Sequence, residues 1–94
     1  MIRAIVLNKN DNVATLIDAG TTGDEATMSG AVNASLKLGT DIPYGHKFAT
    51  ANITRGADIL KYGKVIGRAT AEIAVGEHVH VHNVESLRGR GDQA

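Results

Sequence analysis

Short apolar runs separated by turn residues recur along this chain of 94 residues, a pattern that predicts strands and not helices. Ile2–Leu7 is apolar apart from one charged residue, which is typical of a strand. Residues 8–12 are Asn, Lys and Asp, which favour turns, and strand character resumes over Val13–Ile17. The two runs therefore predict a β-hairpin with a five-residue loop.

The segment that follows carries a weaker pattern. Asp18–Asp24 is rich in turn residues, and residues 25–35 are small and polar. A short helix over Asp24–Met28 is one alternative. Gly30 and the lack of large apolar side chains favour irregular strand and loop instead.

A local pattern then recurs three times: a polar residue, Ile, two variable residues and Gly, followed by a new strand. The copies are Asp41–Gly45, Asn52–Gly56 and Glu72–Gly76. We expect each Ile to anchor a strand end in the core and each Gly to supply a turn position with positive φ. The copies are 11 and then 20 residues apart, too irregular for a solenoid. The expected fold is mainly β, small and strongly bent, with little helix.

Composition and length indicate what the core is made of and how many domains to expect. Only 3% of the residues are aromatic, so the core must be built from Val, Ile, Leu and Ala. Eleven glycines and one proline suit a chain that turns often. A length of 94 residues is enough for one core only, since typical domains contain about 100–150 residues. The residues after 87 are almost free of apolar side chains and are expected to form a tail or a linker.

Charge and cysteine content exclude several classes of protein. Ten Lys and Arg balance ten Asp and Glu, which argues against nucleic-acid binding because that needs a basic face. Zero net charge also gives little protection against self-association, so the formation of a homo-oligomer remains an alternative. The absence of cysteine excludes disulfides and a Cys nucleophile. No apolar stretch is long enough for a membrane span or signal peptide, and a cytoplasmic location is expected.

The histidines are the strongest chemical signal. His78, His80 and His82 alternate with Val79 and Val81, so on a strand the valines would face the core and the imidazoles the other face. The outer two histidines would then lie about 13 Å apart, so that only a neighbouring pair can bind one metal ion. The alternative is an exposed polar face of an edge strand. Asn83 follows directly and can hydrogen-bond a ligand or substrate.

Two further positions are candidates. His46 follows a glycine turn, and an imidazole there can serve as a catalytic base, because its ordinary pKa is about 6.5. Its alternative is an ordinary surface residue. Lys61 and Lys64 flank another turn and can hold a carboxylate or a phosphate, although the pattern by itself favours a solvated turn.

Three segments in fixed order resemble the N-terminal small domain of the altronate and galactarate dehydratases. They are Asp41–Ala49, Ile59–Gly67 and Gly76–Val84, and the closing Glu85–Asp92 is especially similar to altronate dehydratase. The similarity covers residues 1–92 and is loose before residue 36. It implies an SAF-type β-clip fold over residues 1–87, with 88–94 as the tail.

The resemblance implies a metal-dependent hydro-lyase that converts a sugar acid to a 2-keto-3-deoxy acid, with Fe(II) or Mn(II) as cofactor. A much larger catalytic domain or subunit accompanies the small domain in that family, so we expect this chain to be inactive alone. Two alternatives stay open. One is the small subunit of sulfolactate sulfo-lyase, which shares the Gly-His-Lys, Lys-Tyr-Gly and His-Val-His-Asn motifs. The other is a non-catalytic β-clip module that binds a carbohydrate or a protein.

Within this resemblance the candidate residues receive expected roles. His80 and His82 are the expected metal ligands, completed by carboxylates of the large partner. His46 and Lys61 are expected in proton transfer or substrate contact, and Asn83 and Lys47 in substrate binding. A metal on the substrate carboxylate would stabilise the charge that develops when the neighbouring proton is removed.

Overall fold

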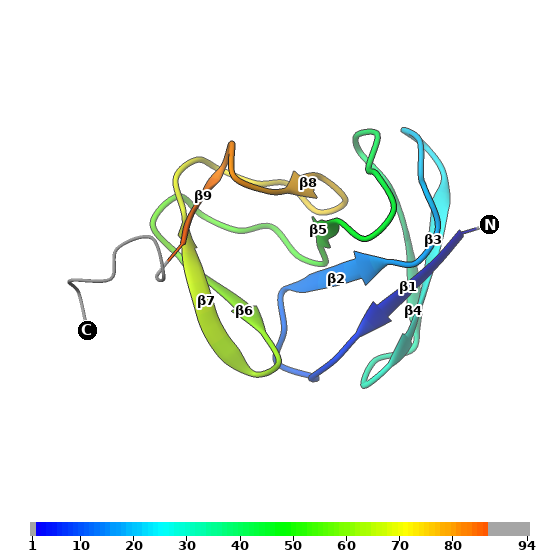
Figure 1. Ribbon diagram of the computed structural model, residues 1–94, viewed down its shortest axis with the longest axis horizontal. Coiled ribbons are helices and arrows are strands. Elements are labelled where there is room, and N and C mark those ends of the chain that lie inside the picture. Colours follow the sequence, from blue (N-terminus) through cyan, green and yellow to red (C-terminus); the bar gives the residue numbers. More distant parts are fainter. Residues whose placement is uncertain (1, 87–94) are drawn as a thin grey trace.

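The computed structural model describes residues 2–86, and every regular element in this range is a β-strand (Figure 1). The mainly β fold expected from the sequence is therefore confirmed. The strands are β1 (Ile2–Val6), β2 (Val13–Leu16), β3 (Glu25–Gly30), β4 (Ala34–Lys37), β5 (Lys47–Ala49), β6 (Asp58–Lys61), β7 (Lys64–Ala69), β8 (His78–Val79) and β9 (Val84–Ser86).

The strands form two curled sheets. A six-stranded sheet has the order β4-β3-β1-β2-β5-β8, and a three-stranded sheet has the order β6-β7-β9. The predicted hairpin of β1 and β2 is confirmed, with Ala4 opposite Leu16 in an antiparallel pair. β3 pairs with the other edge of β1 in parallel. Figure 1 shows the three-stranded sheet at one end of the molecule and β1, β3 and β4 at the other.

Residues 25–35 are more regular than the sequence indicated. They contain all of β3 and the start of β4, which pair as an antiparallel hairpin, so the helix alternative over Asp24–Met28 is wrong. Ala26 and Met28 alternate with polar residues and are buried, which is the period-two pattern of a strand. In the sheet β3 lies between β1 and β4.

The recurring turn pattern is confirmed in all three copies. The isoleucines are buried and each glycine has positive φ: Ile42, Ile53 and Ile73 are 1%, 3% and 2% exposed, and Gly45, Gly56 and Gly76 have φ of 82°, 89° and 86°. β5, β6 and β8 begin shortly after the three turns.

The structure also contains a fourth copy that the sequence did not reveal. Gly20 occupies the isoleucine position, Gly23 has φ of 89°, and β3 follows. A Cβ on Gly20 would collide with the Leu38 side chain and lie 2.7 Å from Ile2 Cδ1. The close packing at this point therefore excludes the isoleucine that marks the other copies.

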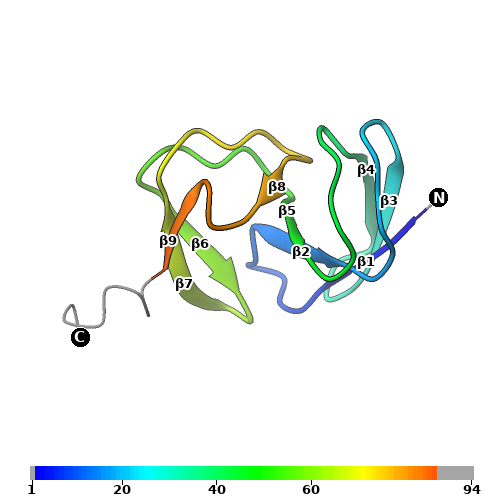
Figure 2. The ribbon, with the colours of Figure 1, turned by 45° about the horizontal axis from the view of Figure 1, so that its top comes forward.

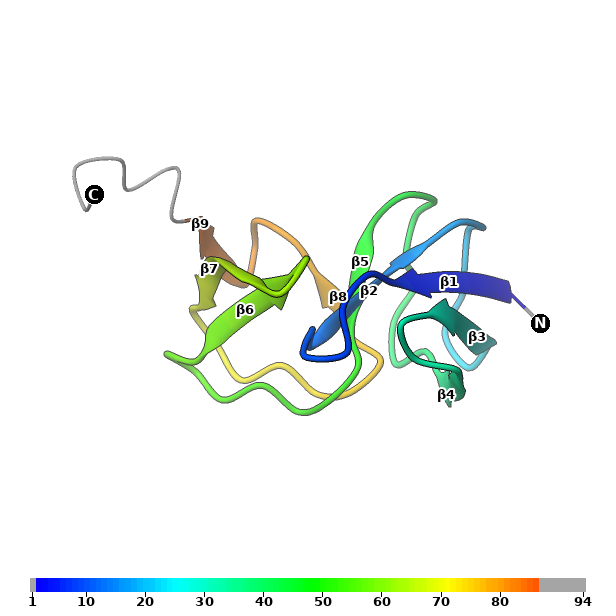
Figure 3. The same cartoon turned by 90° about the horizontal axis from the view of Figure 1, so that it is seen from below.

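The four turns associate in two pairs. Gly20 bridges Ile42, and Ile53 bridges Ile73, so that the connections 50–57 and 70–77 run side by side (Figures 2 and 3). The side-chain oxygen of the polar residue in one turn accepts a hydrogen bond from a backbone N–H of the paired turn. Three such bonds occur: Thr22 to Asp41 at 2.8 Å, Arg55 to Glu72 at 2.9 Å and Val75 to Asn52 at 2.9 Å. The polar position is thus explained by tertiary pairing of the turns.

Two hydrophobic clusters form the core. One lies within the first five strands of the six-stranded sheet around Leu16 and Phe48, and the other joins the two sheets around Ile59 and Val79. Within residues 2–86 no helix is long and apolar enough to cross a membrane. The predicted tail 88–94 and the predicted domain boundary at 87 lie outside the described residues.

Candidate histidine site

The histidine-rich segment is a short strand followed by a turn, and not the long strand that its alternation predicted. β8 ends at Val79, which is fully buried, whereas Val81 is 82% exposed. The expectation that both valines face the core is therefore wrong for Val81. The turn also brings the His82 ring back to a centroid distance of 5.3 Å from His78. The expected separation of the outer histidines is wrong because the backbone reverses after β8.

Asn83 holds this turn in place. Its Oδ1 accepts the N–H of His80 at 3.0 Å, and its Nδ2 donates to the carbonyl of His78 at 2.8 Å. It is the one buried polar residue of the described range, with 8% exposure. A buried amide with both ends bonded contributes rigidity, because an unpaired amide would be costly there. Asn83 therefore fixes the backbone of two histidines, and the substrate contact expected of it stays a prediction.

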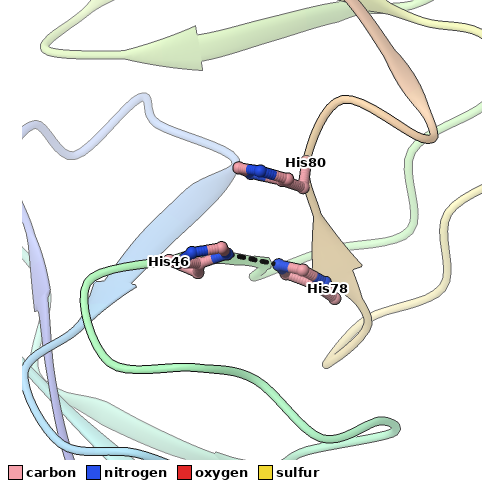
Figure 4. A group of neighbouring side chains, drawn as sticks. All are labelled: His46, His78 and His80. Atoms are coloured by element: carbon pink, nitrogen blue, oxygen red, sulfur yellow. Dashed lines mark hydrogen bonds between the residues drawn. The ribbon is translucent and has the colours of Figure 1, made fainter.

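His46 reaches the same place from the turn before β5. β5 and β8 are antiparallel, with Lys47 opposite Val79, and continuing this register by one pair places His46 opposite His80. The His46 and His80 rings stack with centroids 4.4 Å apart, and His46 Nδ1 lies 2.8 Å from His78 Nε2 (Figure 4). Two segments separated by 32 residues thus form one imidazole cluster.

The cluster of His46, His78 and His80 has a geometry that suits a metal ion. One ring nitrogen from each residue lies within 4.8 Å of the others. The 2.8 Å between His46 and His78 is close to the separation of about 3 Å between neighbouring ligand nitrogens when metal–nitrogen bonds are about 2.1 Å. Neutral imidazoles suit Fe(II), Zn(II) and their first-row neighbours. Among the residues described, no carboxylate belongs to this group.

The surroundings of His78 and His80 lower their pKa values and so favour the neutral imidazole, which is the form that binds metal. Burial lowers the pKa of His78, and the nearby His46, His80, His82 and Lys47 lower it further. Burial also lowers the pKa of His80, followed by the effects of His46, Lys47 and His82. Each charged neighbour that shifts these two pKa values is a cation. A bound metal cation would therefore lower the two pKa values further, and a bound anion would raise them.

Lys47 lies near the cluster, and a second lysine, Lys61, lies near Lys47. Lys47 begins β5 and is half-buried, and Lys61 ends β6 in the other sheet. Burial lowers the pKa of Lys47, and the charge of Lys61 lowers it further. Lys61 Nζ also lies 5.0 Å from the centre of the Tyr62 ring. The structure thus places one predicted lysine, Lys47, near His78 and His80, and the other, Lys61 of the second sheet, near Lys47.

The predicted ligand pair of His80 and His82 is only half represented in the cluster. His80 belongs to it, while the His82 ring lies beside His78 at a centroid distance of 5.3 Å, tilted by 41°. His78 takes part although the sequence interpretation gave it no role. β5 and β8 each follow an equivalent glycine turn, and they pair with each other. A prediction of this pairing from the sequence would have placed His46 beside the His78–His80 segment.

Comparison with known proteins shows the family to which the chain is similar. The chain matches the family model described as altronate/galactarate dehydratase SAF domain over residues 2–87. It is 40% identical over 89 residues to altronate dehydratase of Escherichia coli K12 and 37% identical over 82 residues to that of Bacillus subtilis 168. These alignments cover 95% and 87% of this chain but only 17% and 16% of the two relatives.

A second kind of relative matches a shorter region. The (2R)-sulfolactate sulfo-lyase subunit alpha of Chromohalobacter salexigens is 47% identical over 47 residues, which are 50% of this chain and 50% of that subunit. The match of the family model to residues 2–87, the two long alignments and the all-strand fold lead to one conclusion. The chain belongs to the altronate/galactarate dehydratase SAF domain family.

Proposed function

We propose that this chain is the small SAF part of a metal-dependent sugar-acid dehydratase of the altronate type, acting with a large catalytic domain or subunit. The observation that carries the proposal is the convergence of His46, His78 and His80 in a domain of this family. The reaction removes a proton from the carbon next to the carboxylate and a hydroxyl from the adjacent carbon. Water and a 2-keto-3-deoxy acid are the products.

The histidine cluster is the proposed place for a divalent ion, Fe(II) or Mn(II). When bound, such an ion would supply Lewis-acid stabilisation of the substrate carboxylate and of the departing hydroxide. The cluster itself offers neutral imidazole nitrogens, and oxygen ligands from the large catalytic part would complete the coordination. His82 is a further ligand candidate, since its ring lies 5.3 Å from that of His78.

The lysines are proposed to bind the acid group of the substrate. Lys47 and Lys61 are both cationic, and Lys47 lies close enough to lower the pKa of His78 and His80. A carboxylate placed among these groups would relieve the repulsion between them and gain charge-assisted hydrogen bonds. We assign Lys47 to the substrate carboxylate. Lys61, which lies near Lys47, is assigned to proton transfer, because an amine can exchange a proton with the substrate. His46 belongs to the metal cluster in this proposal.

The surface around the histidines is proposed to face the large catalytic part. Val81 is 82% exposed between His80 and His82, and Tyr44 is 70% exposed beside the turn that carries His46. A large partner that covered these side chains would bury apolar area and exclude water from the histidines. The long relatives, in which this region is about one sixth of the protein, support such a neighbour.

The sulfo-lyase relatives support a second candidate reaction. Their alpha subunits align with about half of this chain. Loss of bisulfite from sulfolactate would need the same proton removal next to a carboxylate, with a different leaving group. A binding module without catalysis is the third candidate, and it predicts that the histidines affect no reaction.

The test is made on the complete enzyme, in which the chain is joined to or purified with its large catalytic part. Altronate, galactarate and sulfolactate are assayed with Fe(II) and with Mn(II), and bound metal is quantified. We expect His46→Ala, His78→Ala and His80→Ala each to lower both metal content and kcat by at least about tenfold.

His82→Ala is the matched comparison, because it removes an imidazole next to the cluster. A smaller effect than that of His80→Ala supports the three-residue cluster, and an equal effect supports His82 as a fourth ligand. Full metal content and full activity in all four variants would overturn the metal proposal. Activity on sulfolactate alone would replace the dehydratase by the sulfo-lyase.

A further inference from the structure

The four glycine turns share one backbone geometry, which allows their side chains to be compared position by position. In each turn the N–H of the fourth residue donates to the carbonyl of the first residue, at 2.9–3.1 Å. The four turns are Thr21–Asp24, Pro43–His46, Thr54–Ala57 and Ala74–Glu77. Glycine is the third residue of each and has positive φ.

Two of these turns bind their own side chain. In the first, the Asp24 carboxylate accepts the N–H of Thr21 at 2.9 Å. In the last, the Glu77 carboxylate accepts the N–H of Ala74. The fourth side chain is thus folded back onto the first residue of its turn. The third turn has Ala57 at this position, whose methyl side chain cannot accept a hydrogen bond.

The second turn differs at both positions. Its fourth residue is His46, whose Nδ1 is bonded to Cγ as an Asp Oδ is, so it has the same reach toward the first residue. Its first residue is Pro43, which has no N–H to donate. His46 Nδ1 is bonded to His78 Nε2 instead, at 2.8 Å.

We propose that Pro43 is a positioning residue of the histidine cluster. By removing the one donor that the turn would offer to the fourth side chain, it leaves the His46 ring without a local partner and directs it to His78. The proposal deepens the proposed function, since the same cluster is the candidate metal site. Its physical content is a competition between a local backbone donor and a distant side chain for one imidazole nitrogen.

The test observes the hydrogen bond between the two rings directly, in metal-free protein of the full chain labelled with nitrogen-15 in histidine. A scalar coupling between His46 Nδ1 and His78 Nε2 is expected in the parent chain. It should be lost in Pro43→Ala, in which the amide is restored. Replacing Pro43 with N-methylalanine by semisynthesis removes the ring but restores no donor, and the coupling should persist.

Two results would overturn the proposal. One is a coupling that survives in Pro43→Ala. The other is a coupling lost equally with alanine and with N-methylalanine, which would mean that the proline ring and not the missing donor matters. Co²⁺ titration then separates the proposal from the proposed function: about tenfold weaker binding in Pro43→Ala, and no further loss when His46→Ala is added, is the expected result. If the parent chain binds no Co²⁺ but shows the coupling behaviour, the role of Pro43 stands, and the metal proposal is decided by the metal content of the complete enzyme.

A second variant tests the competition without altering Pro43. Asp24→His places an imidazole at the same position of the first turn, where Thr21 still offers an N–H. The Thr21 amide should exchange with solvent as slowly as in the parent chain, and about tenfold faster in Asp24→Ala. Equally fast exchange in both variants would show that imidazole cannot use this donor, and the proposal would be overturned.

Discussion

His46 Nδ1 and His78 Nε2 are 2.8 Å apart and share one hydrogen, although 32 residues separate them in the chain. Only one of the two rings can donate in this bond, so the bond requires that at least one nitrogen of the pair is unprotonated. The contact links the strand β8 to the turn before β5 and thereby joins the two segments of the candidate site. It also makes the site sensitive to pH.

The first prediction concerns pH and stability. The pKa values of His78 and His80 are lowered in the folded chain from the ordinary 6.5, chiefly by burial. Between the ordinary and the lowered values the unfolded chain binds more protons than the folded chain. The free energy of unfolding should therefore fall as pH falls below about 6.5, and this loss should end once the lowered values are passed.

Urea denaturation of the metal-free chain between pH 8 and about pH 5 would measure this dependence, above the range in which carboxylates titrate. His78→Gln should flatten the curve, because it removes one of the two shifted groups. A stability that is constant over this range in the parent chain would contradict the prediction.

The second prediction concerns Asn83. Asn83→Ala removes the bonds to His78 and His80 and leaves a backbone N–H and a carbonyl unpaired in a buried place. We expect a loss of about 1–3 kcal/mol in the free energy of unfolding. Asn83→Asp keeps the acceptor for His80 and should lose less. Asn33→Ala, at an exposed position, serves as control and should change stability by less than about 0.5 kcal/mol.

The third prediction compares two turn glycines with similar φ. Gly45→Ala places a methyl group in open space, so only the strained φ of 82° costs stability, about 1–2 kcal/mol. Gly76→Ala meets the Lys37 carbonyl and lies 3.1 Å from Gly39 N, which are backbone atoms that cannot move aside easily. We expect a loss of about 3–5 kcal/mol there. Equal losses in thermal or chemical unfolding would refute the packing argument.

The fourth prediction concerns the exposed apolar rim. Val81→Asp should change the stability of the chain by less than about 0.5 kcal/mol, since Val81 is 82% exposed. It should weaken association with the large catalytic part at least about tenfold, because a buried unpaired carboxylate is unfavourable. Ala31→Asp adds the same charge at the distant turn between β3 and β4 and should leave association unchanged. Unchanged association in Val81→Asp would place the partner elsewhere.

Local patterns predicted much of the fold. The β1–β2 hairpin follows from two apolar runs around a turn of Asn and Asp residues, and the glycine turns follow from their spacing. Both depend on interactions within a few residues. The strand β3 was harder to predict because small side chains carry little periodic signal, and the copy of the turn at Gly20 was hidden because packing replaced its isoleucine.

The candidate site was predicted in its residue types more than in its geometry. Alternation of histidine and valine suggested a straight strand, but the chain turns after Val79 and Asn83 secures the turn. The result is that His78 joins the cluster and Val81 faces outward. A sequence pattern gives the period of a strand but not the residue at which its partner strand ends.

By itself the sequence determined an all-β chain punctuated by glycine turns and carrying the motifs of its family, because these properties rest on local conformational preferences and on residue identity. The tertiary structure decided which histidines meet, since the register of β5 against β8 is a contact between distant segments. It also gave meaning to Pro43, whose missing N–H matters only because His78 lies within reach of the ring at position 46.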